Sequence, residues 1–301
     1  MLVVQRVFFS RRGKESLVWD EVASYIDQAC KLGAKSVVFS GGGEPFCHPQ
    51  VVDAIEYAHA SNLKVGIITN GLLLDQFDLY RVLKASNFLR VSLNAGTTRM
   101  FQLVQGLGKQ SFERVLRNLH YLVKVKHETG SHCVIGAGYL TGHETMDVFE
   151  MEQFIKVSSD VGLDYAQFRP FQRDLTPINL SFANDLIKQY SDKIQVVFSW
   201  QKYEHFADTD LRPYTTCYSS YFITIIGADA QVYSCCELTL RPEWSLGNLR
   251  ITSLDEIWKQ KTEILNKIDI RLCNPFCRGD VINRAMNEVV RLRNNFHSSF
   301  L

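Results

Sequence analysis

A glycine-rich turn that ends in an acid is the part of this chain best suited to bind a ligand. The turn, Gly41-Gly42-Gly43-Glu44-Pro45, directly follows the apolar run 36–40, which is typical of a short buried strand. Glycine has no Cβ, so the backbone of this turn can approach a ligand closely. Glu44 supplies an acceptor for a cationic group, and Pro45 stiffens the exit from the turn. Such turns at the carboxyl ends of parallel strands are where open sheets and barrels bind ligands.

A second candidate site is formed by four cysteines near the C-terminus: Cys217, Cys235, Cys273 and Cys277. The first two lie at the two ends of a predicted β-hairpin, and antiparallel pairing brings such ends together. The C-x3-C loop then adds two more thiolates from one turn. Four thiolates suit an iron–sulfur cluster or zinc, and a zinc knuckle or four unconnected buried thiols remain alternatives. The neighbouring Cys236 competes with Cys235, because alternation along a strand points them to opposite faces.

Composition excludes several classes of partner. The chain has 301 residues, an ordinary apolar fraction of 46% and a net charge of +1, which gives no electrostatic case for a nucleic-acid or membrane-surface partner. No apolar run reaches membrane-spanning length, and the N-terminus 1–6 is too short and too soon charged for a signal peptide. These features predict a cytoplasmic protein. The eight cysteines are then expected to be metal ligands or buried thiols rather than disulfides.

Strand and helix patterns alternate through the first half of the chain. They form five β/α repeats of about 30 residues, the period of βαβ units and a parallel sheet. Right-handed crossovers would close or nearly close these repeats into a barrel with ligands at the carboxyl strand ends. The predicted strands are 37–39, 65–68, 89–93, 133–137 and 165–168.

This rhythm breaks after Pro170. A further strand is possible at 194–198, and a hairpin is predicted from strands 221–225 and 231–235 around a turn at 227–230. Helices are expected at 253–265 and 281–292. We therefore expect a barrel domain over 1–200 and a small second domain over 201–301.

The segment Val38–Pro45, followed by His48-Pro49, resembles the radical SAM superfamily. In that family a GGEP turn after the second barrel strand holds the amino group of S-adenosylmethionine (SAM). The stretches 229–236, 247–249, 255–258 and 277–283 resemble the SPASM/twitch appendix of the same enzymes. The resemblance covers roughly residues 9 to 290. It implies an α/β fold, a partial (β/α)6 TIM-like barrel, with a small C-terminal domain of a β-hairpin and helices that binds a cluster.

The same resemblance assigns residues to the cofactors. Gly42, Gly43, Glu44 and Pro45 would surround the amino end of SAM, and Asn70 ends a strand on the same rim. Ser92 and Asn94 sit where the family places ribose contacts, and Gly136 where adenine rests. Gln167 and Arg169 would reach the carboxylate of SAM or the substrate. With only four candidate ligands, the resemblance favours the shorter twitch form, with one auxiliary [4Fe–4S] cluster on Cys217, Cys235, Cys273 and Cys277.

One part of the family pattern is missing. Radical SAM enzymes hold their SAM-cleaving cluster on a C-x3-C-x2-C loop after the first strand, but no cysteine precedes Cys30. The chain also begins with a predicted helix where the family begins with a strand, so the first barrel strand is expected to be missing. This favours a truncated radical SAM enzyme, inactive as given. The alternatives are a degenerate binding protein without catalysis, or a zinc-stabilised scaffold.

An active form would need a reductant such as flavodoxin or ferredoxin. Its substrate, a small molecule or a peptide, is not identified by any residue.

Overall fold

The computed structural model describes residues 2–5, 16–41, 43–171, 179–204, 212–239, 241–273 and 277–293. Its strands form one sheet in the order β10-β9-β8-β1-β2-β3-β4-β5-β6-β7. From β1 to β7 each strand is parallel to the next. These strands are β1 Leu2–Gln5, β2 Ala34–Phe39, β3 Lys64–Thr69, β4 Phe88–Val91, β5 Val134–Thr141, β6 Tyr165–Pro170 and β7 Gln195–Phe198.

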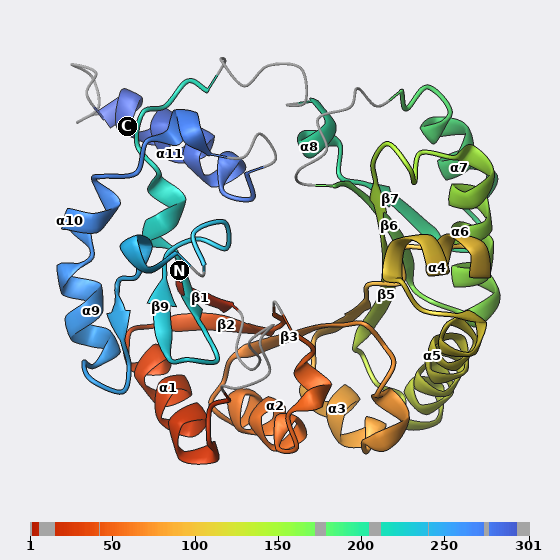
Figure 1. The fold of residues 1–301 in the computed structure, drawn as a ribbon, viewed down its shortest axis with the longest axis horizontal. Coiled ribbons are helices and arrows are strands. Elements are labelled where there is room, and N and C mark those ends of the chain that lie inside the picture. Colours follow the sequence, from red (N-terminus) through yellow and green to blue (C-terminus); the bar gives the residue numbers. More distant parts are fainter. Residues whose placement is uncertain are drawn as a thin grey trace.

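Helices connect these strands and cover the outer side of the curved sheet (Figure 1). This is the layout of a partial barrel, as the alternating sequence pattern predicts. The connecting helices are α1 Trp19–Lys31, α2 Val51–Ala60, α3 Leu79–Ala85, α4 Thr98–Gln105, α5 Lys109–Thr129, α6 Val148–Val161 and α7 Ala183–Gln189, with α8 Trp200–Glu204 following β7. The short helices α4 and α8 were not expected from the sequence.

Local signals explain where the helices begin and end. The Asp147 side chain accepts hydrogen bonds from the first N–H groups of α6, and Gly162 ends that helix with a left-handed φ of +85°. Such a backbone angle favours glycine, which has no Cβ to clash. The helices pack on a core that includes Phe168 of β6, whose ring stacks on Phe198 of β7 with centroids 4.7 Å apart.

The two faces of the barrel strands differ in chemistry. In β6, Ala166 and Phe168 are fully buried against the helices. The alternate residues Tyr165, Gln167 and Arg169 are only partly buried, and period-two alternation places them together on the opposite, concave face. The inside of this barrel is therefore polar at β6.

The expectation of a missing first strand is wrong. Leu2–Gln5 form β1, which pairs in parallel with β2 through partners such as Val4 and Val37. Leu2–Gln5 is a short segment, and the sequence after it has no apolar periodicity. The periodicity of the sequence therefore did not predict this strand. The reason for preferring truncation therefore falls away.

The C-terminal part joins the same sheet at β1. Strand β8 is parallel to β1, and β9 and β10 continue in antiparallel order. The remaining elements are β8 Ile223–Ile226, β9 Gln231–Tyr233, β10 Gly247–Asn248, α9 Leu254–Gln260, α10 Thr262–Leu265 and α11 Asp280–Arg293. The single helix predicted over 253–265 is thus two helices, and the second strand of the hairpin ends before Cys235. The proposed domain boundary near residue 200 stays a prediction.

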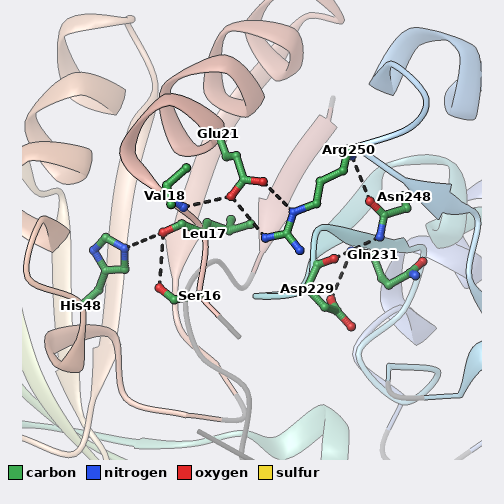
Figure 2. Close-up of polar contacts among 9 residues, drawn as sticks. All are labelled: Ser16, Leu17, Val18, Glu21, His48, Asp229, Gln231, Asn248 and Arg250. Carbon is green, nitrogen blue, oxygen red and sulfur yellow. Dashed lines mark hydrogen bonds and ion pairs between the residues drawn. The ribbon is translucent and has the colours of Figure 1, made fainter. Parts of the chain in front are cut away.

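Polar contacts fasten this C-terminal part to the start of α1 (Figure 2). The Arg250 guanidinium donates from Nε to Oε1 of Glu21 at 2.6 Å, and Asn248 donates to the Asp229 carbonyl at 3.0 Å. On the barrel side, the Gln50 N–H donates to Nδ1 of His48, so Nε2 of that imidazole donates to the Leu17 carbonyl at 2.9 Å. His48 is thereby a buried residue held by two hydrogen bonds. None of the helices in the described ranges is long and apolar enough to cross a membrane.

Candidate cofactor site at the strand ends

The turn after β2 is tied to the end of β3 through the Glu44 carboxylate. Oε1 of Glu44 accepts hydrogen bonds from the Thr69 hydroxyl at 2.6 Å and from the Phe46 N–H at 3.1 Å. Oε2 accepts from the Asn70 N–H at 2.7 Å. The structure therefore brings Glu44 and Asn70 together, as predicted, although it is the backbone of Asn70 that makes the contact. Gly42 lies outside the described residues.

The Glu44 carboxylate retains capacity for one more donor. An ionised carboxylate offers about four lone-pair sites, and three are used by these contacts. Burial raises the pKa of Glu44, while the hydrogen bonds from Thr69, Asn70 and Phe46 lower it. Pro45 is buried at the start of a short 3₁₀ turn, and Gly43 is partly exposed beside it. A buried carboxylate with a free acceptor site suits an ammonium group.

The residues after β4 are held mainly by backbone contacts. The Asn94 side-chain oxygen accepts from the Leu140 N–H at 3.1 Å, and the Asn94 N–H donates to the Gly138 carbonyl at 2.9 Å. Asn94 is buried in the left-handed region with φ +56°. The Ser92 N–H donates to the Thr69 carbonyl at 2.8 Å. Asn94 therefore braces β5, and its part in ribose binding stays a prediction, as does that of Ser92.

The predicted adenine position is covered by an aromatic ring. A Cβ built on Gly136 would lie 2.3 Å from ring atoms of Tyr165, so this ring packs directly on the glycine backbone of β5. Burial raises the pKa of the Tyr165 phenol. An adenine at Gly136 would need the Tyr165 ring to move, and this assignment stays a prediction.

Gln167 and Arg169 face the concave side of the barrel together with Arg90, a residue that sequence reasoning missed. The Arg90 Nη1 donates to the Gln167 side-chain oxygen at 2.9 Å. A Cβ on Gly138 would lie 3.5 Å from Nη2 of Arg169 and 3.8 Å from Nε of Arg90. The signal in the sequence was available: Arg90 is a lone charge within the apolar strand 88–91, which period-two alternation aims away from the helices.

The four predicted cysteine ligands lie within electrostatic range of one another. The pKa of Cys277 is raised to about 11, chiefly by burial and also by the thiols of Cys217 and Cys273. Cys277 in turn raises the pKa of Cys235. All four are free thiols. Among the residues described here, no three Cys, His, Asp or Glu side chains are grouped so that they could hold a metal ion, and the four-cysteine site stays a prediction.

Strand alternation does not distinguish Cys235 from Cys236, contrary to the expectation from the sequence. Because β9 ends at Tyr233, strand alternation does not reach these two residues. A hydrogen bond from Cys236, followed by burial, raises the pKa of Cys235, which also senses Cys277. Cys236 instead raises the pKa of Lys202, and it lies near the Glu237 carboxylate. The choice of Cys235 over Cys236 as the ligand stays a prediction.

The donor sets present fit one of the two clusters that radical SAM proteins use. Four thiols at Cys217, Cys235, Cys273 and Cys277 match the chemistry of a [4Fe–4S] site. The free acceptor site on Glu44 fits the amino group of SAM. The loop between β1 and α1 contains no cysteine, so the residues there do not fit a SAM-cleaving cluster.

Comparison with known protein families agrees with this arrangement. Residues 6–155 match the model of the radical SAM superfamily. Residues 217–289 match the model of the iron–sulfur cluster-binding domain named SPASM. These two domains imply SAM and [4Fe–4S] clusters as cofactors.

Several curated proteins are similar over part of the chain. An AdoMet-dependent heme synthase from Methanosarcina barkeri is 32% identical over 36% of this chain and 31% of its own length. Molybdenum cofactor biosynthesis protein 1 from Dictyostelium discoideum is 27% identical over 63% of this chain and 28% of its own length. The chain thus spans less than a third of these relatives.

A solved structure shares the fold over nearly the whole chain. The structure of Streptococcus suis SuiB bound to S-adenosylmethionine has a TM-score of 0.64 and 14% identity, and covers 94% of this chain and 69% of that protein's chain. The shared fold agrees with the family matches, which show that the chain belongs to the radical SAM superfamily and carries a SPASM iron–sulfur cluster-binding domain.

Proposed function

We propose that this chain binds SAM at the strand ends and holds one auxiliary [4Fe–4S] cluster, but does not reductively cleave SAM by itself. The observation that carries the SAM site is the Glu44 carboxylate, fixed by Thr69 and Asn70 with one acceptor site to spare. The proposal that this chain does not cleave SAM rests on the absence of any cysteine before Cys30.

The chain's own residues have distinct parts in this proposal. Glu44 accepts a hydrogen bond from the SAM ammonium, while Gly43 leaves the approach open beside it. Cys217, Cys235, Cys273 and Cys277 hold the cluster, which when bound supplies a one-electron redox centre. No step is assigned to a SAM-cleaving cluster, because its ligands are not in this chain.

The test of this proposal measures binding and cleavage separately on the anaerobically reconstituted chain. We expect SAM to bind in equilibrium dialysis, with affinity lowered about tenfold or more by Glu44→Gln, since a charged hydrogen bond is worth roughly 1.5–3 kcal/mol. The exposed Glu113→Gln is the control and should bind SAM normally. With dithionite and SAM, no 5′-deoxyadenosine should form. Its formation would refute the lack of cleavage, and equal SAM affinity in Glu44→Gln would refute the site.

A binding protein without catalysis is the alternative to a truncated radical SAM enzyme. As a binding protein, the chain would bind SAM or a peptide without catalysis and would form a complex with an active homologue. Sequencing the coding region upstream of Met1 separates the two: an in-frame C-x3-C-x2-C segment there supports truncation. Only the truncated-enzyme alternative would need a reductant such as ferredoxin or flavodoxin.

A further inference from the structure

Positively charged side chains gather on the concave face of the barrel and above it. Arg90 comes from β4 and Arg169 from β6, and Lys202 comes from α8, which packs against β6. The Tyr203 hydroxyl of α8 lies 2.9 Å from the Thr141 hydroxyl at the end of β5, which fixes this helix over the strand ends. Arg278, next to Cys277, contributes to the field at all three cations.

The two arginines meet over a glycine. Nη2 of Arg169 and Nε of Arg90 both lie within 4 Å of the point that a Cβ on Gly138 would occupy. A Cβ at this position would touch both side chains at ordinary van der Waals distance. Arg90 and Arg169 are partly buried, and strand alternation places both side chains on the concave face of the sheet.

These cations have no acidic partner among the described residues. No ion pair within 4.0 Å forms from Arg90, Arg169 or Lys202 in that part of the chain, whereas Arg81, Arg114 and Arg250 each have one. The Nε atoms of Arg90 and Arg169 are buried without a hydrogen-bond partner. Arg90 makes one side-chain hydrogen bond, to Gln167. Buried charges without partners are costly in folded proteins, which indicates that a ligand completes them.

Burial and repulsion among these cations lower the pKa values of Arg169 and Lys202. Burial, then Arg90 and Arg278, lower the pKa of Arg169 to about 9. Burial, then Arg169, Arg278 and Arg90, lower the pKa of Lys202 to about 8. An anion among these groups would relieve both effects.

We propose that Arg90, Arg169 and Lys202 form the subsite for a phosphate group on the substrate. This inference rests on the proposed function, because it takes the concave face of the barrel as the substrate chamber. It narrows the substrate class to phosphorylated small molecules.

Charge and geometry favour phosphate over a single carboxylate. A phosphate monoester carries about −1.5 to −2 charge near neutral pH and presents three acceptor oxygens, which matches cations arriving from β4, β6 and α8. One arginine already satisfies one carboxylate in a bidentate pair. The SAM carboxylate alone would leave the other cations unpaired.

The experiment uses the full, anaerobically reconstituted chain and inorganic pyrophosphate as the probe, with acetate at equal ionic strength as the carboxylate comparator. Isothermal titration calorimetry is run on the wild type and on Arg90→Gln, Arg169→Gln and Arg169→Lys. Arg117→Gln, an exposed site on α5, is the charge-matched control. SAM affinity, iron content and the thermal unfolding midpoint are measured on each preparation.

We expect pyrophosphate to bind and acetate not to bind. Arg169→Gln and Arg90→Gln should each weaken pyrophosphate binding about tenfold or more, Arg169→Lys less, and Arg117→Gln not at all. SAM affinity should stay within twofold in Arg90→Gln, a residue with no assigned role in SAM binding. If Arg169→Gln fails to fold, Arg90→Gln and Arg169→Lys decide the question.

Three results overturn the proposal. They are pyrophosphate binding no better than acetate, equal weakening by Arg117→Gln, and weakened SAM binding with pyrophosphate unaffected, which would assign the cations to the SAM carboxylate. Because the titration needs no SAM, failure of the wild-type chain to bind SAM, with its pyrophosphate binding intact, would count against the proposed function alone.

Discussion

The Thr69 hydroxyl donates a hydrogen bond of 2.6 Å to the Glu44 carboxylate, which ties the glycine-rich turn after β2 to the last residue of β3. The same hydroxyl accepts from the Gly71 N–H at 3.0 Å. Thr69 is buried, and its contact fixes the carboxylate before any ligand arrives. Such preorganisation lowers the cost of binding.

Replacing Thr69 by Val should distinguish two contributions of Glu44 to SAM binding: the orientation of its carboxylate by Thr69 and the charge of that carboxylate. The variant loses the hydroxyl and leaves the Gly71 N–H without its partner, so we expect the free energy of unfolding to fall by about 1–3 kcal/mol. SAM affinity should fall less than in Glu44→Gln, because the carboxylate remains. Urea unfolding and equilibrium dialysis measure the two effects. A Thr69→Val protein with SAM affinity as low as that of Glu44→Gln would contradict this division.

The ion pair between Glu21 and Arg250 should contribute modestly to docking of the C-terminal part. The Arg250 side chain is 43% exposed and that of Glu21 is 20% exposed, and pairs of this kind contribute roughly 0.2–1 kcal/mol. The hydrogen bond from Arg250 lowers the pKa of Glu21. Its contribution is therefore present above the ordinary glutamate pKa and is lost as the pH falls through the lowered value.

Thermal unfolding of Glu21→Gln and Arg250→Gln, singly and together, checks this pair. The double-mutant cycle should give a coupling energy at pH 7 that shrinks toward zero in strong acid. A coupling that stays constant over this range would show that the stability comes from packing and not from charge.

The two adjacent cysteines should differ in their effect on the cluster. Cys235→Ser should reduce bound iron sharply, because Cys235 is the ligand that the resemblance to the SPASM/twitch appendix assigns. Cys236→Ser is the matched control and should keep its iron. Iron and acid-labile sulfide are assayed after reconstitution of both variants. Loss of iron in Cys236→Ser alone would move the ligand assignment to Cys236.

Zinc, the alternative metal, should bind with a steep pH dependence. Burial raises the pKa of Cys277 to about 11, so binding near neutral pH must release its proton, and affinity should rise up to about tenfold per pH unit for each thiol deprotonated. Competition with a chelator between about pH 6.5 and 8.5 measures this slope. Cys277→Ser should flatten it, and an unchanged slope would exclude this thiol as a ligand.

Most of the barrel was predictable because its helices and buried strands carry clear periodicity. The run Val148–Val161 shows its apolar face, its capping Asp147 and its terminal Gly162 in the sequence itself. Strand β1 was not predictable, because Leu2–Gln5 acquires its role only by pairing with β2 and β8. The pairing of β8 with β1 is equally a long-range contact that local patterns do not encode.

The candidate site was predictable as a list of residues and less so as a set of contacts. The motif around Glu44 pointed to the strand end, but its partner Thr69 is an ordinary strand residue that only tertiary structure brings close. The ring of Tyr165 over Gly136 and the meeting of Arg90 with Arg169 also depend on the register of β4, β5 and β6. Short sequence motifs do not determine the register between strands that are joined by βαβ crossovers.

The most direct test of the whole account is the iron and sulfide content of the reconstituted chain, with its electron paramagnetic resonance spectrum after reduction. The account predicts about four iron and four sulfide per chain in one [4Fe–4S] cluster, lost in Cys277→Ser. About eight iron per chain, or zinc without sulfide, would contradict it.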